Sequence, residues 1–192
     1  MKPDKWSVQT RWLHIGLALT VTLQLAISLV MEPPNEKDAS ALAHAAFEAH
    51  EFVGMTALAI VLTHWAWSLI SRADGGLARL FPWSGSALAE VKSDIAGLMK
   101  GRLPDGGPRG GLPGMVHGLG FLAVTAMALT GGTLFFLFPE SGKPDNTVNF
   151  IVELHEFISN FVWVYWGGHV AMGLLHKRAG HNTVQEMFTL KP

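Results

Sequence analysis

Four stretches of this chain contain no charged side chain at all. Asp, Glu, Lys and Arg are absent from residues 12–31, 52–71, 110–139 and 157–176. Each stretch is close to the roughly 20 apolar residues that a helix needs to cross a hydrocarbon core about 30 Å thick. The pattern therefore predicts transmembrane helices over about 9–31, 50–71, 114–137 and 154–176. The expected fold is all-α, an integral membrane four-helix bundle that forms one domain over residues 1–192.

A weaker helical pattern lies in the long connection 72–113. Apolar residues recur at helical spacing from Leu88 to Met99, with Lys92 between them and Lys100 directly after them. This predicts an amphipathic helix on the membrane surface, between the second and third spans, with Ser84 or Ser86 as its N-cap. The first apolar segment is longer than a signal-peptide core, so we expect it to be retained as a helix.

The charges are few and unevenly distributed between the connections. Only 15% of the residues are charged and 49% are hydrophobic, whereas a soluble domain has about 25% charged residues. The N-terminus, the 72–113 connection and the C-terminus together contain 12 of the 14 basic residues. The positive-inside rule then predicts that these segments, and both termini, are cytoplasmic. The other side, over residues 32–51 and 139–156, contains nine acids and two bases, which predicts an acidic outer surface.

Histidine is the leading candidate for binding a metal. The chain has no cysteine, which excludes disulfides, iron–sulfur clusters and covalently attached c-type haem. Its nine histidines need a reason, because ionisable groups in a bilayer are rare and usually functional. His155 and His169 are fourteen residues apart in the fourth predicted helix. Fourteen helical steps leave both rings on one face and separate them by about 21 Å, so one lies near each membrane surface.

Haem is the metal group that fits this arrangement best, since two imidazoles from facing helices can clamp a macrocycle inside a bundle. His50 begins the second helix at the level of His155, and His14 begins the first at the level of His169. However, His64 lies fourteen residues after His50. The second and fourth helices alone could then supply four ligands. The residues therefore leave His14 and His64 as alternative partners of His169.

Two further features near these histidines have open interpretations. His117 lies near the start of the third helix, and we expect it to contact a haem propionate or a quinone, with plain packing as the alternative. Glycines near the histidines would let a porphyrin lie against the backbone, although small residues also serve close helix packing in membranes. His44, His176 and His181 are expected near the surface, in contact with water. The glycines are Gly16, Gly54, Gly118, Gly131, Gly132, Gly167 and Gly168.

Five short segments resemble the bacterial cytochrome b561 family, which includes the cytochrome b subunits of nickel–iron hydrogenases. They are TRWLHIG (10–16), HEFVG (50–54), LHEF (154–157), GGHVAMGLLH (167–176) and HNTVQEMF (181–188). The resemblance covers nearly the whole chain. It implies two haem b groups, one held by His14 with His169 and one by His50 with His155. Many relatives have arginine at the position of His64, which leaves the ligands on that side open.

The resemblance also implies a quinone-linked electron carrier in the bacterial inner membrane. It would pass electrons between ubiquinone or menaquinone and a periplasmic partner, and the acidic outer surface favours a basic c-type cytochrome or redox subunit. Nothing points to a nucleic acid partner. One alternative is a superoxide:quinone oxidoreductase, although the outer acids would repel an anion. Another is a haem-free anchor, or a transporter whose histidines relay protons.

Overall fold

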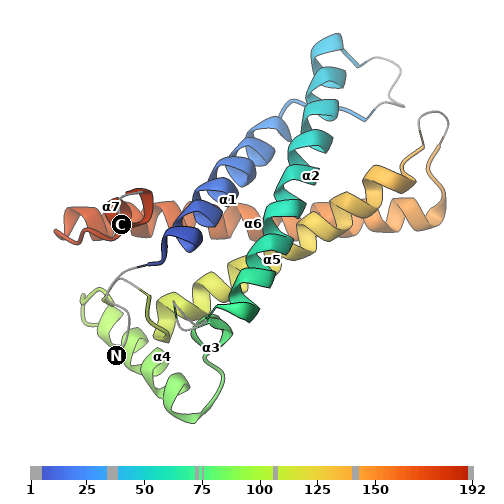
Figure 1. Cartoon of the computed structure of the whole chain (residues 1–192). Coiled ribbons are helices and arrows are strands. Elements are labelled where there is room, and N and C mark those ends of the chain that lie inside the picture. Colours follow the sequence, from blue (N-terminus) through green and yellow to red (C-terminus); the bar gives the residue numbers. More distant parts are fainter. Residues whose placement is uncertain are drawn as a thin grey trace. The chain divides into compact units, whose positions relative to one another are not determined.

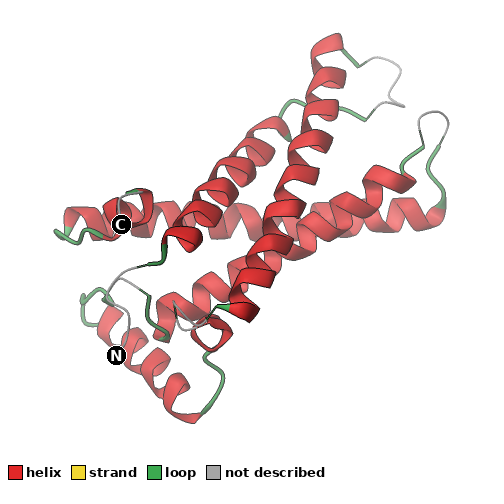
Figure 2. Ribbon diagram, viewed as in Figure 1, coloured by secondary structure: helices red, strands yellow, loops and turns green. Residues whose placement is uncertain are grey.

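The computed structural model describes residues 6–33, 39–71, 74, 76–105, 108–139 and 143–189. Within these residues there are seven helices and no strand, so the predicted all-α class is confirmed (Figures 1 and 2). The four long helices are α1 (Val8–Ile27), α2 (Ala41–Ile70), α5 (Gly111–Leu137) and α6 (Asn146–Arg178). The three shorter helices are α3 (Gly76–Leu80), α4 (Gly85–Leu98) and α7 (Thr183–Phe188).

The long helices start or end at other residues than the uncharged stretches predict. α2 starts at Ala41, nine residues before the predicted start, and α6 starts at Asn146 rather than 154. Residues 41–49 are mostly alanine, with leucine and glutamate, and these are strong helix formers that extend α2 beyond its apolar run. α1 instead ends at Ile27 rather than 31, and residues 28–30 form a turn.

The amphipathic helix predicted in the 72–113 connection is present as α4. Ser84 occupies its N-cap position, although its side chain makes no capping hydrogen bond. Val91 is buried, whereas Ile95 and Leu98 on the same helix are exposed. The location of α4 on a membrane surface stays a prediction. The short helices α3 and α7 were not predicted, because five or six residues show too little periodicity.

Two of the described helices, α2 and α5, are long and apolar enough to cross a membrane. Only 17% of the most apolar 18-residue stretch is buried in each. Phe52, Ile70 and Phe136 are all more than 70% exposed, and such apolar surface is unfavourable in water. A hydrocarbon environment would bury this apolar surface. α1 and α6 contain more polar residues, and their crossing of the membrane stays a prediction.

The chain divides into two compact units, and each long helix contributes to both. The first unit consists of the described residues within Met1–Ile15, Thr63–Leu122 and Tyr165–Pro192. The second consists of Gly16–Leu62 and Ala123–Val164. His14, His64, His117 and His169 therefore belong to the first unit, and His50 and His155 belong to the second.

In the first unit, a buried carboxylate holds the start of α1. Asp74 is 6% exposed and accepts hydrogen bonds from the Ser7 backbone N–H at 2.8 Å and the Ser7 hydroxyl at 2.7 Å. The Thr10 hydroxyl is its third donor. Negative charge at a helix N-terminus also interacts favourably with the helix dipole. Asp74 thus connects the chain just before α3 to the first turn of α1.

Close backbone packing places α3 on α5 in the same unit. A Cβ atom added to Gly114 would overlap the Arg79 carbonyl oxygen, and one added to Gly118 would overlap that of Leu80. The two glycines are four residues apart, so they lie on one face of α5. This face accepts the α3 backbone, and the packing determines where the side chain of Arg79 begins.

Glycines also allow close packing in the second unit. A Cβ atom on Gly132 would lie 2.9 Å from the Leu58 side chain, and one on Gly16 would lie 3.2 Å from Ile60. Val61 is fully buried. The helices α1, α2 and α5 are therefore in contact here through small residues, as is common between membrane helices.

Candidate functional site

In the second unit, His50 of α2 and His155 of α6 face one another. Their ring centres are 6.4 Å apart and their planes are inclined by 80°. An imidazole nitrogen lies about 2.0–2.1 Å from a zinc ion, and the centre of the ring lies roughly 1.1 Å beyond that nitrogen. Two imidazoles on opposite sides of one first-row metal therefore have ring centres about 6.2–6.4 Å apart. The observed separation therefore fits one metal atom between the two rings.

A hydroxyl on α5 orients the ring of His155. Thr130 Oγ1 lies 2.8 Å from His155 Nδ1 and donates its own proton to the Ala126 carbonyl oxygen at 2.8 Å. It therefore accepts the proton of Nδ1–H, which leaves the Nε2 lone pair of a neutral His155 available to a metal. A Cβ atom on Gly131 would lie 3.1 Å from His155 Cε1, so the α5 backbone also restrains this ring.

In the first unit, His14 of α1 and His169 of α6 form a similar pair. Their ring centres are 6.1 Å apart and their planes are inclined by 55°. Nδ1 of His14 in this pair and Nδ1 of His50 in the other are buried and have no hydrogen-bond partner among the described residues. A buried nitrogen without a partner is costly. Both pairs therefore have nearly the ring spacing expected for one metal atom between two imidazoles, and Nδ1 of His14 and of His50 still needs a hydrogen-bond acceptor.

Three further rings surround the His14/His169 pair. Tyr165 stacks on His169 at 5.5 Å, and His117 contacts His169 edge-on at 5.0 Å. Phe188 of α7 lies 5.9 Å from His14. Sequence reasoning missed Tyr165, although it is the only tyrosine of the chain and precedes His169 by one helical turn.

The structure brings His14, rather than His64, against His169. The Nδ1 atom of His64 lies 3.2 Å from the Ser68 hydroxyl, and its ring contacts Phe121 at 4.8 Å. Neither contact involves His169. Of the two alternatives that the spacing of the histidines left open, the geometry favours His14.

Most of the glycines near the histidines serve helix packing. Gly54 faces the Gln24 side chain, and Gly118 faces the α3 backbone. By contrast, a Cβ atom on Gly167 or Gly168 would meet no described atom within 4 Å. These two glycines directly precede His169 and are exposed, so no described residue packs against them.

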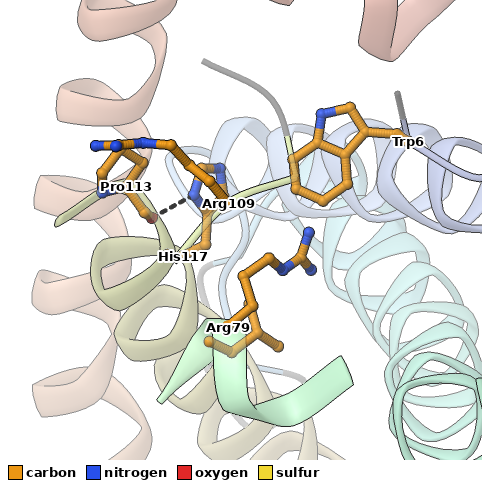
Figure 3. A pocket seen from close by; sticks show the side chains of 7 residues that line it. Trp6, Arg79, Arg109, Pro113 and His117 are labelled. Carbon is orange, nitrogen blue, oxygen red and sulfur yellow. Dashed lines mark hydrogen bonds between the residues drawn. The ribbon is translucent and has the colours of Figure 1, made fainter. Parts of the chain in front are cut away.

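A small cavity near His117 contains two arginines that the sequence identified only as basic loop residues. Its lining includes Trp6, Arg79, Arg109 and His117 (Figure 3). His117 Nδ1–H donates to the Pro113 carbonyl oxygen at 2.6 Å. This bond orients the ring, whose predicted contact with a propionate or a quinone stays a prediction.

Several predicted features lie at the surface or beyond the described residues. His176 and His181 are half-buried, and their Nδ1 atoms lie 2.8 Å apart in a hydrogen bond, so their predicted contact with water stays a prediction. The outer acids Glu36, Asp38 and Glu140 lie outside the described residues.

Comparison with known proteins identifies the family. The sequence pattern of the family described as prokaryotic cytochrome b561 matches residues 5–190. No curated protein and no solved structure matches the chain. The family match spans nearly all 192 residues. It includes both histidine pairs and agrees with the resemblance of the five short segments. This chain belongs to the prokaryotic cytochrome b561 family, whose members are membrane proteins that transfer electrons through haem b.

Proposed function

We propose that this protein holds two haem b groups and passes electrons between a membrane quinone and a periplasmic redox partner. The observation that carries the proposal is the presence of two histidine pairs with ring centres 6.1 and 6.4 Å apart. His14 and His169 would hold one haem, and His50 and His155 would hold the other. Bound haem iron supplies one-electron redox chemistry at each pair.

The paired histidines favour electron transfer over oxygen chemistry. When each side of an iron is occupied by an imidazole, no coordination position is open to oxygen or to a substrate. Tyr165, His117 and Phe188 pack around the His14/His169 pair. These contacts restrain the ligand rings, which limits the reorganisation that accompanies a change of charge.

The two pairs suit transfer across a bilayer. α6 is continuous from Asn146 to Arg178 and carries both His155 and His169. Fourteen residues of α-helix extend about 21 Å, which is a large part of the hydrocarbon thickness. We propose that all four long helices cross the bacterial inner membrane with both termini cytoplasmic. The His50/His155 pair is then near the periplasm.

The charge of the outer connections favours a basic partner. Glu32, Glu48 and Asp145 are described, and Glu36, Asp38 and Glu140 add to them in the sequence. A negative surface attracts a basic protein, for example a c-type cytochrome, and raises its association rate. It repels superoxide, so we rank superoxide oxidation below electron transfer to a protein.

Measuring the haem content tests the proposal. Pyridine haemochrome analysis of the purified protein should give two haem b per chain, released by acidified acetone because no cysteine is present to attach them. His50→Ala and His155→Ala should remove the same spectral component, and His169→Ala the other. A ratio of one haem or none, or spectrally different losses in the His50 and His155 variants, would contradict it.

A further inference from the structure

The strongest unexplained feature of the first unit is the guanidinium of Arg79. It lies 4.2 Å from the centre of the Trp6 ring, in a cation–π contact (Figure 3). Its Nε and Nη1 atoms are buried and have no hydrogen-bond partner among the described residues. Burial lowers the pKa of Arg79 to about 10, although nearby Asp74 opposes this shift. Arg79 therefore remains charged at neutral pH.

No described carboxylate neutralises this charge directly. Asp74 uses both of its oxygens to accept hydrogen bonds from Ser7 and Thr10. In the same cavity, Arg109 pairs with Asp94, but its own Nε is also buried without a described partner. A buried charge without a partner is strongly unfavourable. The cavity thus combines one unneutralised guanidinium with unused N–H donors, which is a site for an anionic oxygen.

The cavity is small and close to the His14/His169 pair. Its volume is about 10 Å³, which is room for about one water-sized group. A carboxylate oxygen fits this space, whereas a quinone ring does not. His117 lines the cavity and contacts the ring of His169 at 5.0 Å. The His117 ring therefore borders both the cavity and one of the proposed haem ligands.

We propose that Arg79 binds a propionate carboxylate of the haem that His14 and His169 hold. This inference rests on the proposed function. Arg79 donates from Nε and Nη1 to the carboxylate, Arg109 adds its own unused Nε–H donor, and Trp6 covers the Arg79 guanidinium. The Gly114 and Gly118 surface of α5 places α3, and so Arg79, at this position.

Redox titration of the complete protein tests this assignment. A positive charge near a haem favours the reduced iron, because reduction adds an electron. Arg79→Gln should therefore lower the midpoint potential of the His14/His169 haem. We expect about a tenfold change in its reduction equilibrium, which is about 59 mV for one electron. The His50/His155 haem should keep its potential.

Arg102→Gln is the matched control, because it removes an exposed arginine from the same connection. It should change the midpoint potential of neither haem.

Infrared spectroscopy provides a second readout if Arg79→Gln folds poorly. Haem with ¹³C-labelled propionates should show a shifted carboxylate band in Arg79→Lys, which keeps the charge but loses the forked donors. An unchanged band, an unchanged potential or an equal shift of both haems would overturn the assignment. If Arg79→Gln lost a bound anionic phospholipid while both haem potentials stayed unchanged, the assignment would also be overturned. The cavity would then be a site for a lipid phosphate. If the unsubstituted protein contained no haem, the proposed function itself would fail.

Discussion

Among the candidate ligands, His155 has a side-chain hydrogen bond that orients its ring, and the partner is the Thr130 hydroxyl. It accepts the Nδ1 proton of His155 and donates to the backbone of its own helix. Partners of this kind hold a ligand ring in one tautomer and orientation, and their loss typically lowers metal affinity about 10–100-fold. We therefore propose Thr130 as a positioning residue for the proposed His50/His155 site.

Replacing Thr130 with valine should weaken this site alone. Thr130→Val keeps the shape of the side chain but leaves His155 Nδ1–H without an acceptor, so haem affinity at the His50/His155 pair should fall about 10–100-fold. Thr130→Ser should restore it. The measurement is a haem titration of the haem-depleted protein, followed at the Soret band.

The control for this substitution is Thr133→Val on the same helix. The Thr133 hydroxyl donates to the Leu129 carbonyl oxygen at 2.8 Å and is exposed, so its loss should leave haem affinity unchanged. Equal losses of haem affinity in Thr130→Val and Thr133→Val would show that the Thr130 hydroxyl acts through the α5 helix and not through His155.

Substitution of His14 and His64 separates the two ligand candidates. His14→Ala should remove one haem, because its ring lies 6.1 Å from His169. His64→Ala should retain both, because His64 contacts Phe121 and Ser68. Reduced-minus-oxidised spectra of the α-bands provide the measurement. Retention of both haems in His14→Ala, with loss of one in His64→Ala, would reverse the assignment.

At the scale of elements, the contact of α3 with α5 depends on the absence of a side chain at Gly118. In Gly118→Ala the new Cβ would overlap the Leu80 carbonyl oxygen, and backbone cannot move aside as a flexible side chain can. We expect a loss of about 1–3 kcal/mol of stability, typical of overpacking. Thermal unfolding in detergent should therefore occur at lower temperature.

Gly173→Ala provides the comparison. Its Cβ would lie 3.5 Å from Val184, an ordinary contact, and alanine stabilises a helix interior by roughly 0.5–1 kcal/mol relative to glycine. Gly173→Ala should therefore unfold at the same or a higher temperature. If Gly118→Ala were as stable as Gly173→Ala, α3 would not be held on α5 in the way described.

At the scale of the whole molecule, the acidic segments 32–51 and 139–156, which the proposed topology places outside, predict electrostatic steering of the proposed partner. Electron transfer to a basic partner should slow as ionic strength rises, because screening acts over about 8–10 Å near physiological salt. Stopped-flow reoxidation of the haems by a basic c-type cytochrome measures this effect. Amide substitution of four outer acids should reproduce the slowing at low salt: Glu36, Asp38, Glu140 and Asp145.

The alternative is that acids collect outside only because the positive-inside rule keeps bases away. Rates that respond neither to salt nor to the amide substitutions would support that explanation. Reduction of the haems by superoxide near the diffusion limit would instead show that the two leading functions were ranked in the wrong order.

Much of the helical architecture could be predicted from the sequence, because charged side chains are expensive in lipid and their absence is visible along the chain. The helix ends were less predictable. Residues 41–49 form helix from local propensity, which a search for uncharged stretches does not register. α3 is held by its packing on α5, and no local signal records such a contact.

The sequence alone determined the all-helical class, the absence of covalent haem attachment and the spacing of His155 and His169. These depend on composition and on helical periodicity, which are local properties. Only the tertiary structure showed that His14 lies against His169, that Thr130 contacts His155 and that Arg79 lines one cavity with His117. These contacts join residues that are far apart in the chain. Their formation depends on how the helices pack, which spacing along one helix does not specify.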